Sequence, residues 1–288
     1  MIRELAPAKL NLVLQVGRPR PDGLHPICSL FASLDLADEL ELAPREGSGA
    51  DVVECPGVTG VNLAAQALAA FRERAGGAEL PPLQLTIEKR IPVAAGLGGG
   101  SADAAAALRA ANRLAGEPLD HKELLAIAAG LGSDVPSQVT PGHAIVQGTG
   151  EVIEPVALPA LAALLVPHEE GLAAAAVYAE LDRVEGWREQ LEPETIRALL
   201  GGPQELPAGR VDGTPEALAA GLDNDLQAAA LSLRPELGDT LAALRATGAP
   251  AAGVSGSGPA CFALFPDPAA AELAARDIPG ALVARLRS

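Results

Sequence analysis

The chain has 288 residues, 49% hydrophobic and only 2% aromatic, so it is globular, long enough for one large domain or two ordinary ones, and its core is mostly Leu, Val, Ile and Ala. Its formal net charge is −16, with 21 Lys and Arg against 37 Asp and Glu. This charge argues against nucleic acid and anionic membrane as partners, whereas a small anionic ligand can still bind where backbone N–H groups and a few cations oppose the overall field.

Strands and helices are expected to mix in the first half of the chain. Apolar residues alternate over residues 10–16, which predicts a strand, and Lys9 and Asn11 share one face of it because side chains two apart point the same way. A turn is expected at residues 18–25, RPRPDGLH. Helices are expected over residues 62–74 and 104–114. A third helix is expected to begin at Asp120, which forms a capping box with Glu123, and to end at Gly130 or Gly132. Strands are expected over residues 83–88 and 144–147, and a tight turn over residues 132–136.

The pattern weakens near residues 155–159, where we place a domain boundary that separates residues 1–155 from residues 156–288. The second half predicts a strand over residues 161–166, helices over 173–183, 235–247 and 269–276, and a last strand over 281–286. Residues 201–215 are rich in Gly and Pro and predict a loop. A second glycine-serine turn, GVSGSGPA, leads into a strand, CFALF, within residues 251–265.

Three scattered cysteines, Cys28, Cys55 and Cys261, form no CxxC pair, which argues against a disulfide scaffold or a zinc site and fits a reducing cytosol. The N-terminal residues contain no apolar stretch typical of a signal peptide, and the most apolar run, residues 157–166, is too short to cross a bilayer. We therefore expect a cytoplasmic protein.

The stretch PVAAGLGGGSA, residues 92–102, joins a predicted strand to a predicted helix without the polar residues typical of a linker. Its glycines permit unusual backbone angles and close approach of another molecule, and the helix behind them offers free N–H groups at the positive end of its dipole. The Walker pattern is excluded because no lysine is present, and the dinucleotide pattern fails at Ser101. A phosphate site and a simple packing turn both remain open interpretations.

Other polar residues favour the phosphate site when they are taken together. Lys9 and Asn11 share a strand face, Asp134 lies in the turn before Pro136, and residues 253–258 repeat the glycine-serine character. Each alone is explained as well by a surface charge, a helix cap or a bend. Together they supply the phosphate cradle, the cation and the carboxylate that phosphoryl transfer requires.

Three motifs in order resemble the superfamily of galactokinase, homoserine kinase, mevalonate kinase and phosphomevalonate kinase, the GHMP kinases. They are PVAAGLGGGSADAA, which resembles the phosphate-binding motif, APAKLNL at residues 6–12 and GVSGSGPACFALF at residues 253–265. Residues 6–38 and 131–151, with Asn224-Asp225-Leu226, are similar to the 4-diphosphocytidyl-2-C-methyl-D-erythritol kinase family. The resemblance implies an α+β fold of two domains, one like the second domain of a small-subunit ribosomal protein and the other ferredoxin-like.

The resemblance also implies the reaction. A kinase of this family uses ATP with Mg²⁺ to phosphorylate the 2-hydroxyl of cytidine diphosphate methylerythritol, giving the 2-phosphate and ADP, in the non-mevalonate route to isoprenoid precursors. The magnesium is expected to arrive with ATP, since the sequence shows no dedicated cluster of metal ligands. The expected partner is this small-molecule substrate, with no nucleic acid and no membrane, and the protein is expected to be a monomer or weak homodimer.

Matching positions then assign the site residues. Lys9 and Asp134 match the catalytic pair, in which Asp134 would accept or orient the hydroxyl proton and Lys9 would stabilise negative charge on the attacking oxygen. Asn11, His25 and Tyr178 match substrate-contacting positions, with His25 suited to the edge of cytosine and Tyr178 to its face. The residues that match the ATP site are Asn62, Lys89, Pro92, Val93, Ala94, Ala95, Gly96, Leu97, Gly98, Gly99, Gly100, Ser101 and Ala102.

The chain departs from the family pattern in several places, which bear on cytidine recognition. Leu24 stands where the family usually has a stacking tyrosine, residues 173–176 are all alanine where Ser or Thr is usual, Ala102 replaces a second serine, and residues 137–138 replace two phenylalanines. Loss of one aromatic ring that stacks on a base costs about 1–3 kcal/mol of binding free energy. Another GHMP-type alcohol kinase is therefore an alternative, as is a non-catalytic nucleotide-binding regulator, although a regulator needs neither catalytic residue.

Overall fold

The computed structural model describes residues 1–76, 80–201 and 215–287. Its contacts divide the chain into two compact units, which are interleaved along the sequence. Unit 1 contains Met1–Ala8, Leu36–Val93 and Gly98–Pro141, and unit 2 contains Lys9–Asp35, Ala94–Leu97 and the chain from Gly142 on. Two long strands, β1 (Ile2–Val16) and β2 (Ile27–Pro44), contribute residues to both units. The domain boundary expected after residue 155 stays a prediction.

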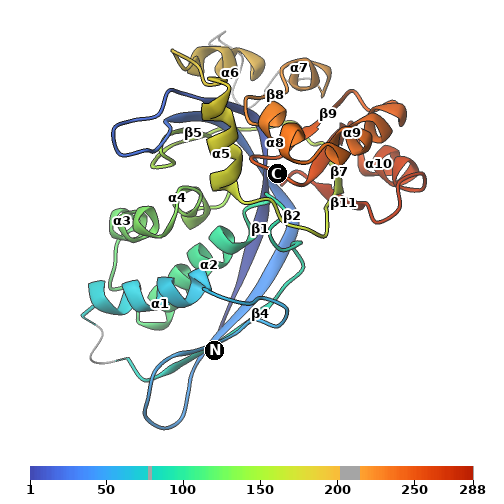
Figure 1. Cartoon of the computed structure of the whole chain (residues 1–288). Helices are drawn as coiled ribbons and strands as arrows, with labels where there is room; N and C mark the ends of the chain where they lie inside the picture. The colour runs from blue at the N-terminus through green and yellow to red at the C-terminus, as the bar shows by residue number, and fades with distance from the viewer. Residues whose placement is uncertain (77–79, 202–214, 288) are drawn as a thin grey trace. The chain divides into compact units, whose positions relative to one another are not determined.

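Unit 1 places helices against a small sheet, as Figure 1 shows for α1, α2 and β4. In the sheet β3 runs parallel to β4, and β4 runs antiparallel to the second half of β2, with Leu42 opposite Leu85. The remaining elements of unit 1 are β3 (Val52–Glu54), β4 (Leu83–Glu88), α1 (Leu63–Arg74), α2 (Gly99–Leu114), α3 (His121–Leu131) and α4 (Val135–Val139).

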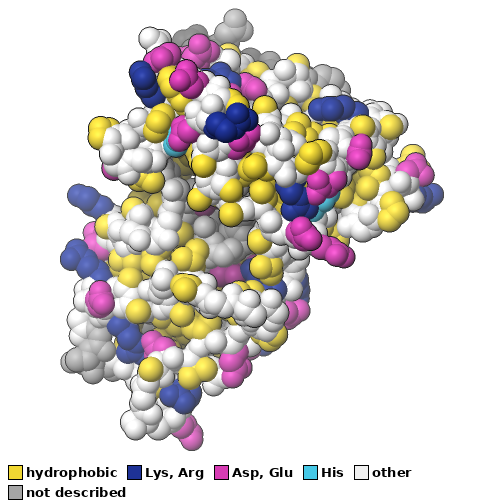
Figure 2. All heavy atoms as spheres, viewed as in Figure 1, with side chains coloured by type: hydrophobic (Ala, Val, Ile, Leu, Met, Phe, Trp, Pro, Cys, Tyr) yellow, Lys and Arg dark blue, Asp and Glu magenta, His cyan; other side chains and the backbone are white. Residues whose placement is uncertain are grey.

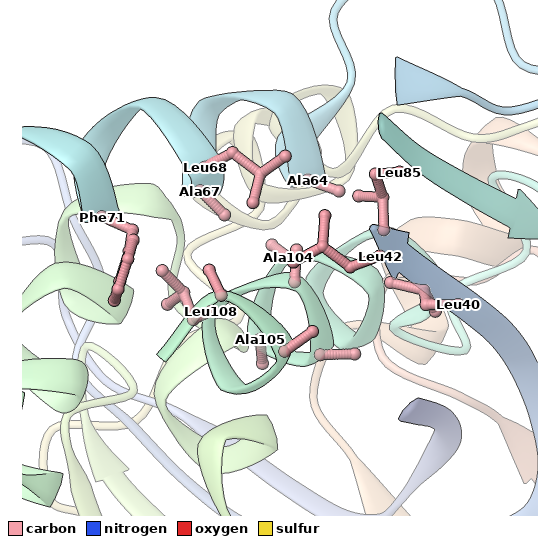
Figure 3. Packing of buried hydrophobic residues seen from close by; sticks show 14 of the residues in the cluster. Leu40, Leu42, Ala64, Ala67, Leu68, Phe71, Leu85, Ala104, Ala105 and Leu108 are labelled. Atoms are coloured by element: carbon pink, nitrogen blue, oxygen red, sulfur yellow. The ribbon is translucent and has the colours of Figure 1, made fainter. Parts of the chain in front are cut away.

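The core of unit 1 depends on small side chains between α1 and α2. Figure 3 shows Ala64 and Ala67 of α1 and Ala104 of α2 pointing into the same cluster as Leu42 and Leu85 of the sheet. All five side chains are fully or almost fully buried. Because alanine occupies little volume, it lets the two helices and the sheet approach one another closely. The alanine-rich tract is therefore a packing surface as well as a helix former.

Unit 2 contains a four-stranded antiparallel sheet with the order β11-β7-β10-β9. In chain order its strands are the fourth, first, third and second, which is the ferredoxin-like arrangement implied by the resemblance. A separate ladder joins the first half of β2 to β5 and β5 to β6, and β1 pairs in parallel with β8. The elements are β5 (Ala144–Gly148), β6 (Val152–Pro155), β7 (Ala162–Val166), α5 (Ala174–Arg183), α6 (Pro193–Leu199), α7 (Pro215–Ala220), β8 (Asp223–Asn224), α8 (Gln227–Leu233), α9 (Glu236–Ala246), β9 (Ala251–Val254), β10 (Cys261–Phe265), α10 (Pro268–Ala275) and β11 (Leu282–Arg285).

The predicted helices and strands are confirmed, with two differences in extent. The first strand begins at Ile2, well before the alternating region, and the helix expected from residue 104 begins at Gly99, inside the glycine run. The long strand β2 was not predicted, because residues 27–34 are buried on both faces and show no alternation. Smaller elements were also missed, among them α4, α6 and α8. The loop expected at residues 201–215 lies almost entirely outside the described residues.

Charged side chains of both signs lie on the surface. On the face shown in Figure 2, Asp and Glu side chains are spread over the surface and interspersed with Lys and Arg. None of the helices in the described part of the chain is both long and apolar enough to cross a membrane.

The packing of α1 predicts a position-dependent effect of one substitution. Ala67→Val adds volume to a fully buried site and should lower the free energy of unfolding by about 1–3 kcal/mol. Ala69→Val, in the same helix but exposed, should cost less than about 0.7 kcal/mol, which is the difference in helix propensity alone. Urea denaturation of both variants measures the two values, and equal costs would contradict the packing described.

Candidate active site

Lys9 and Asn11 lie together in unit 2, as their spacing on the strand predicts. Both are buried, with 4% and 3% of their surface exposed. The Lys9 Nζ donates a hydrogen bond to the Asn11 Oδ1 at 2.5 Å and lies 4.5 Å from the centre of the Phe31 ring. The Asn11 Nδ2 donates to the Ser29 Oγ at 2.9 Å. A buried ammonium group needs such polar and aromatic partners, and these two residues stabilise the charge of Lys9 on β1.

The second glycine-serine turn lies against Asn11. The Asn11 backbone N–H donates to the Ser255 Oγ at 3.3 Å, and that hydroxyl donates to the Gly96 carbonyl at 3.2 Å. Gly256 has φ +59°, and a Cβ there would lie 3.0 Å from the Asn11 Oδ1. The turn therefore connects the Lys9–Asn11 pair to the glycine-rich stretch through one serine, a role that sequence reasoning did not assign to Ser255.

The Asn-Asp-Leu motif holds this turn in place. The Asn224 Nδ2 donates to the carbonyls of Val254 and Gly256, each at 2.8 Å, and the Asn224 Oδ1 accepts the Leu226 N–H at 2.9 Å. The side chain of Asp225 accepts the Val16 N–H at 2.8 Å. The motif was noticed in the sequence only as a family resemblance, and the contacts give it a structural role.

The middle of the phosphate loop, which we define as residues 92–102, is fixed through its backbone in unit 2. The Leu97 carbonyl accepts the Lys9 N–H at 3.0 Å, and the Ala95 carbonyl accepts the Ala260 N–H at 2.9 Å. Gly96 has φ +78°, and a Cβ there would lie 2.6 Å from the Gly258 carbonyl oxygen. Gly96 is therefore required both for its backbone conformation and for the space that it leaves.

The end of the phosphate loop becomes the first turn of α2 in unit 1. Gly98 lies before the helix with φ +72°, and no side chain caps the helix start. The first N–H groups of a helix lack partners within the helix and lie at the positive end of its dipole, which suits an anion. Gly100 is exposed, Ser101 is half-buried and Ala102 is fully buried. The side chain of Ala102 is therefore not available to an anion at the start of α2.

Lys89 has two carboxylate partners in unit 1. Its Nζ lies 2.5 Å from the Asp38 Oδ2 and 2.7 Å from the Asp103 Oδ2. Burial alone would lower the pKa of Lys89, but the two carboxylates outweigh burial and raise it. Burial, together with the nearby Asp38 carboxylate, raises the pKa of Asp103 to about 7 despite Lys89. Neither aspartate partner was identified from the sequence.

Asn62 and Asp134 occupy the starts of two helices in unit 1. The Asn62 Oδ1 accepts the Ala64 N–H at 2.9 Å and so caps α1. Asp134 directly precedes α4, and its carbonyl accepts the Ser137 hydroxyl at 2.8 Å. Because Lys9 belongs to unit 2 and Asp134 to unit 1, their catalytic pairing stays a prediction.

His25, which precedes β2, packs against α5 in unit 2. Its ring lies close to two side chains of α5 and to one backbone carbonyl. Its Nδ1 is 2.8 Å from the Gly17 carbonyl oxygen, and its Nε2 is 3.4 Å from the Asp182 Oδ1. Its ring centre lies 5.1 Å from that of Tyr178. Tyr178 and Asp182 are one helical turn apart and so share a face. The structure brings together the two residues predicted for cytosine and adds Asp182, while Leu24 is 51% exposed.

The described residues include no group of three His, Cys, Asp or Glu side chains placed to hold a metal ion.

The Lys89 network predicts a pH dependence of stability. Between the ordinary carboxyl pKa of 3.8 and the raised value of about 7, Asp103 keeps a proton in the folded chain that the unfolded chain has released. The free energy of unfolding should therefore fall as the pH rises through this window and level off above it. Asp103→Asn should remove this part of the slope, and the exposed Asp277→Asn should leave it unchanged. Chemical denaturation from pH 4.5 to pH 8 measures both, and an unaltered slope in Asp103→Asn would disprove the assignment.

The sequence of the chain matches known families and known proteins. A family model described as the GHMP kinases N terminal domain matches residues 62–142, and one described as GHMP kinases C terminal matches residues 204–284. The 4-diphosphocytidyl-2-C-methyl-D-erythritol kinase of Nocardia farcinica is 43% identical over 97% of this chain and 90% of its own length. The enzyme of the same name from Streptomyces coelicolor is 42% identical over 96% and 90%.

Solved structures agree with these relatives. A crystal structure of 4-(cytidine 5'-diphospho)-2C-methyl-D-erythritol kinase matches with a TM-score of 0.80 and 35% identity over the whole of both chains. Homoserine kinase from Cytophaga hutchinsonii, at 21% identity and a TM-score of 0.69 over 99% of this chain and 94% of its own, shares the fold. With both family models matched and these relatives 42–43% identical along nearly the whole chain, the chain belongs to the GHMP kinases.

Proposed function

We propose that this kinase phosphorylates the 2-hydroxyl of 4-diphosphocytidyl-2-C-methyl-D-erythritol with ATP, in the non-mevalonate route to isoprenoid precursors. The observation that carries the proposal is the identity of 35–43% with proteins of this name along nearly the whole chain. The Lys9–Asn11 pair, the phosphate loop and the His25–Tyr178 pair each agree with it.

In the proposed reaction the 2-hydroxyl oxygen of the substrate attacks the γ-phosphorus of ATP. A new oxygen–phosphorus bond forms as the bond to the β,γ-bridging oxygen breaks and ADP leaves. Asp134 accepts or orients the hydroxyl proton, and Lys9 stabilises negative charge on the attacking oxygen. Asn11 holds the ammonium group of Lys9 in place through its 2.5 Å hydrogen bond.

We propose that the phosphate loop holds the ATP phosphates through backbone N–H groups. The side chains of Ala95, Leu97 and Ala102 are buried, so in this proposal they support the loop from behind. The uncapped start of α2 supplies further donors and the positive end of the helix dipole. Mg²⁺ is proposed to arrive on the ATP phosphates, where it neutralises charge on the transferred group.

For the substrate, we propose that cytosine stacks on Tyr178 and that His25 contacts its edge. The Gly17 carbonyl oxygen lies 2.8 Å from the Nδ1 of His25 and so orients the imidazole, which leaves the Nε2, 3.4 Å from the Asp182 Oδ1, for the edge of cytosine. We further propose a cytoplasmic monomer or weak homodimer that binds no nucleic acid, in line with the net charge of −16.

A second candidate is a GHMP-type kinase whose alcohol substrate lacks a nucleotide. Leu24 replaces a stacking ring, and residues 173–176 offer only alanine side chains beside the substrate positions. Under this interpretation the phosphate loop and the catalytic pair keep the roles proposed above, and only the acceptor changes.

Asp134→Asn tests the catalytic assignment. The amide keeps the size of the side chain but is not a base, so turnover with ATP and the cytidyl substrate should fall at least about a hundredfold. ATP binding, measured by calorimetry with a non-hydrolysable analogue, should stay within about threefold of the unmodified chain. Turnover near the unmodified rate would contradict this role for Asp134.

Gly96→Ala tests the phosphate loop. The added methyl group meets the Gly258 carbonyl oxygen at 2.6 Å, so the loop must shift and the KM for ATP should rise about tenfold or more. Gly116→Ala is the matched control, because Gly116 has a similar φ of +80° but open space around it. It should lose about 1–2 kcal/mol of stability and keep its KM for ATP. Equal KM values in the two variants would argue against the loop as the ATP site.

Tyr178→Ala separates the two candidate substrates. Loss of the ring should raise the KM for the cytidyl substrate about tenfold, while Tyr178→Phe, which keeps the stacking face, should resemble the unmodified chain. CMP should inhibit the unmodified chain competitively and should inhibit Tyr178→Ala more weakly. If millimolar CMP neither inhibits nor thermally stabilises the unmodified protein, the second candidate is favoured.

A further inference from the structure

Asp38 caps the chain just before the phosphate loop. Its Oδ1 accepts the N–H groups of Arg90 and Ile91 at 2.6 and 2.8 Å. These are the last two backbone donors before Pro92, which has none. Because Asp38 is fully buried, it holds the entrance of the loop without reaching solvent or any ligand.

Lys89 connects this entrance to the other end of the loop. Its ammonium group bridges Asp38, on β2, to Asp103, on the second turn of α2, at 2.5 and 2.7 Å. Gly99, the first residue of α2, packs directly on the entrance, since a Cβ there would lie 3.1 Å from the Ile91 Cγ2 and 3.3 Å from the Lys89 Nζ. Residues 91 and 99 are thus held close together while the loop runs between them.

Stability alone is a weak reason for this network. Two buried carboxylates share one ammonium group whose side chain is 12% exposed, and the Asp103 Oδ1 has no hydrogen-bond partner among the described residues. Buried ion pairs often stabilise a fold no more than apolar side chains of similar volume would, because desolvation offsets the attraction. Their better-supported use is to specify one geometry. Here the geometry that they specify is the distance between the two ends of the phosphate loop.

We propose that Asp38, Lys89 and Asp103 form a loop clamp, in which Asp38 and Asp103 are positioning residues for ATP that act through Lys89 and the loop backbone. The proposal rests on the proposed role of residues 92–102 in holding the ATP phosphates. The clamp fixes the backbone before Pro92 and the first N–H groups of α2, so that ATP binding does not have to order them.

Asp38 variants test the clamp. Asp38→Ala removes both backbone contacts and one partner of Lys89, so the KM for ATP should rise about tenfold or more, while kcat at saturating ATP should fall less than about threefold. Asp38→Asn keeps the Oδ1 that accepts both N–H groups but turns an N–H2 group toward the Lys89 Nζ in place of Oδ2, so it should bind ATP more tightly than Asp38→Ala and still more weakly than the unmodified chain. Asp103→Asn, which keeps the shape of the side chain but loses its charge, should raise the KM for ATP several-fold. The KM for the phosphate acceptor should not change in any of the three.

Asp51→Ala is the matched control. Asp51 also accepts a backbone N–H in unit 1, from Leu83 at 2.8 Å, and also pairs with a cation, Arg72 at 2.6 Å. It directly precedes β3 and contacts the first residue of β4, whereas Lys89 follows the last residue of that strand. It should lower the melting temperature without changing the KM for ATP. If Asp38→Ala and Asp103→Asn do the same, the network is only structural and the clamp is wrong.

Binding of a non-hydrolysable ATP analogue, followed by calorimetry, keeps this test separate from the substrate assignment. Weaker binding in Asp38→Asn and Asp103→Asn than in the unmodified chain supports the clamp even if the cytidyl compound is not phosphorylated, in which case the proposed function fails alone. If Asp38→Ala does not fold, these two variants decide the question, since both preserve the size of the side chain. Unchanged analogue affinity in both would overturn the proposal.

Discussion

The structure depends on one constraint, which is that the phosphate loop must be held in a single conformation although its four glycines have no side chains to pack. Gly96 shows how tight this constraint is, since a single methyl group would meet the Gly258 carbonyl oxygen at 2.6 Å. Glycine loses more conformational entropy on ordering than any other residue, so such a loop needs contacts from its surroundings. Many of the polar contacts described above supply them, including Ser255 on the Gly96 carbonyl and Asp38 before Pro92.

Two lysines illustrate how a cation is held in a chain whose net charge is −16. The half-buried Lys89 lies between two carboxylates at 2.5 and 2.7 Å inside unit 1. The buried Lys9 contacts the amide of Asn11 and lies over the Phe31 ring, partners that orient its ammonium group. Under the proposed function, Lys89 would act on ATP indirectly, through the phosphate loop, and Lys9 would act directly on the reacting oxygen.

Local signals in the sequence predicted local structure well, because the physics that they report acts within a few residues. The capping box at Asp120 and Glu123 is present, and the alternation over residues 83–88 gives a strand with one buried face. The partners of the site residues could not be found in this way. Asn11 meets Ser255, 244 positions along the chain, and Lys89 meets Asp38, 51 positions away. Such pairs depend on how the strands and helices pack, and no periodicity within one segment indicates them.

The phosphate loop combines both kinds of information. Its glycines identify it in the sequence, but a glycine run alone is equally compatible with a flexible linker. What distinguishes the two is anchoring: Asp38 and Lys89 hold the loop at its ends in unit 1, and Lys9, Ser255 and Ala260 hold its middle through the backbone in unit 2. A loop that is ordered before its ligand arrives loses less entropy on binding, and its N–H groups act as fixed dipoles toward developing charge. Under the proposed function, the affinity for ATP would therefore depend on residues that do not touch the nucleotide, and a motif search overlooks such residues.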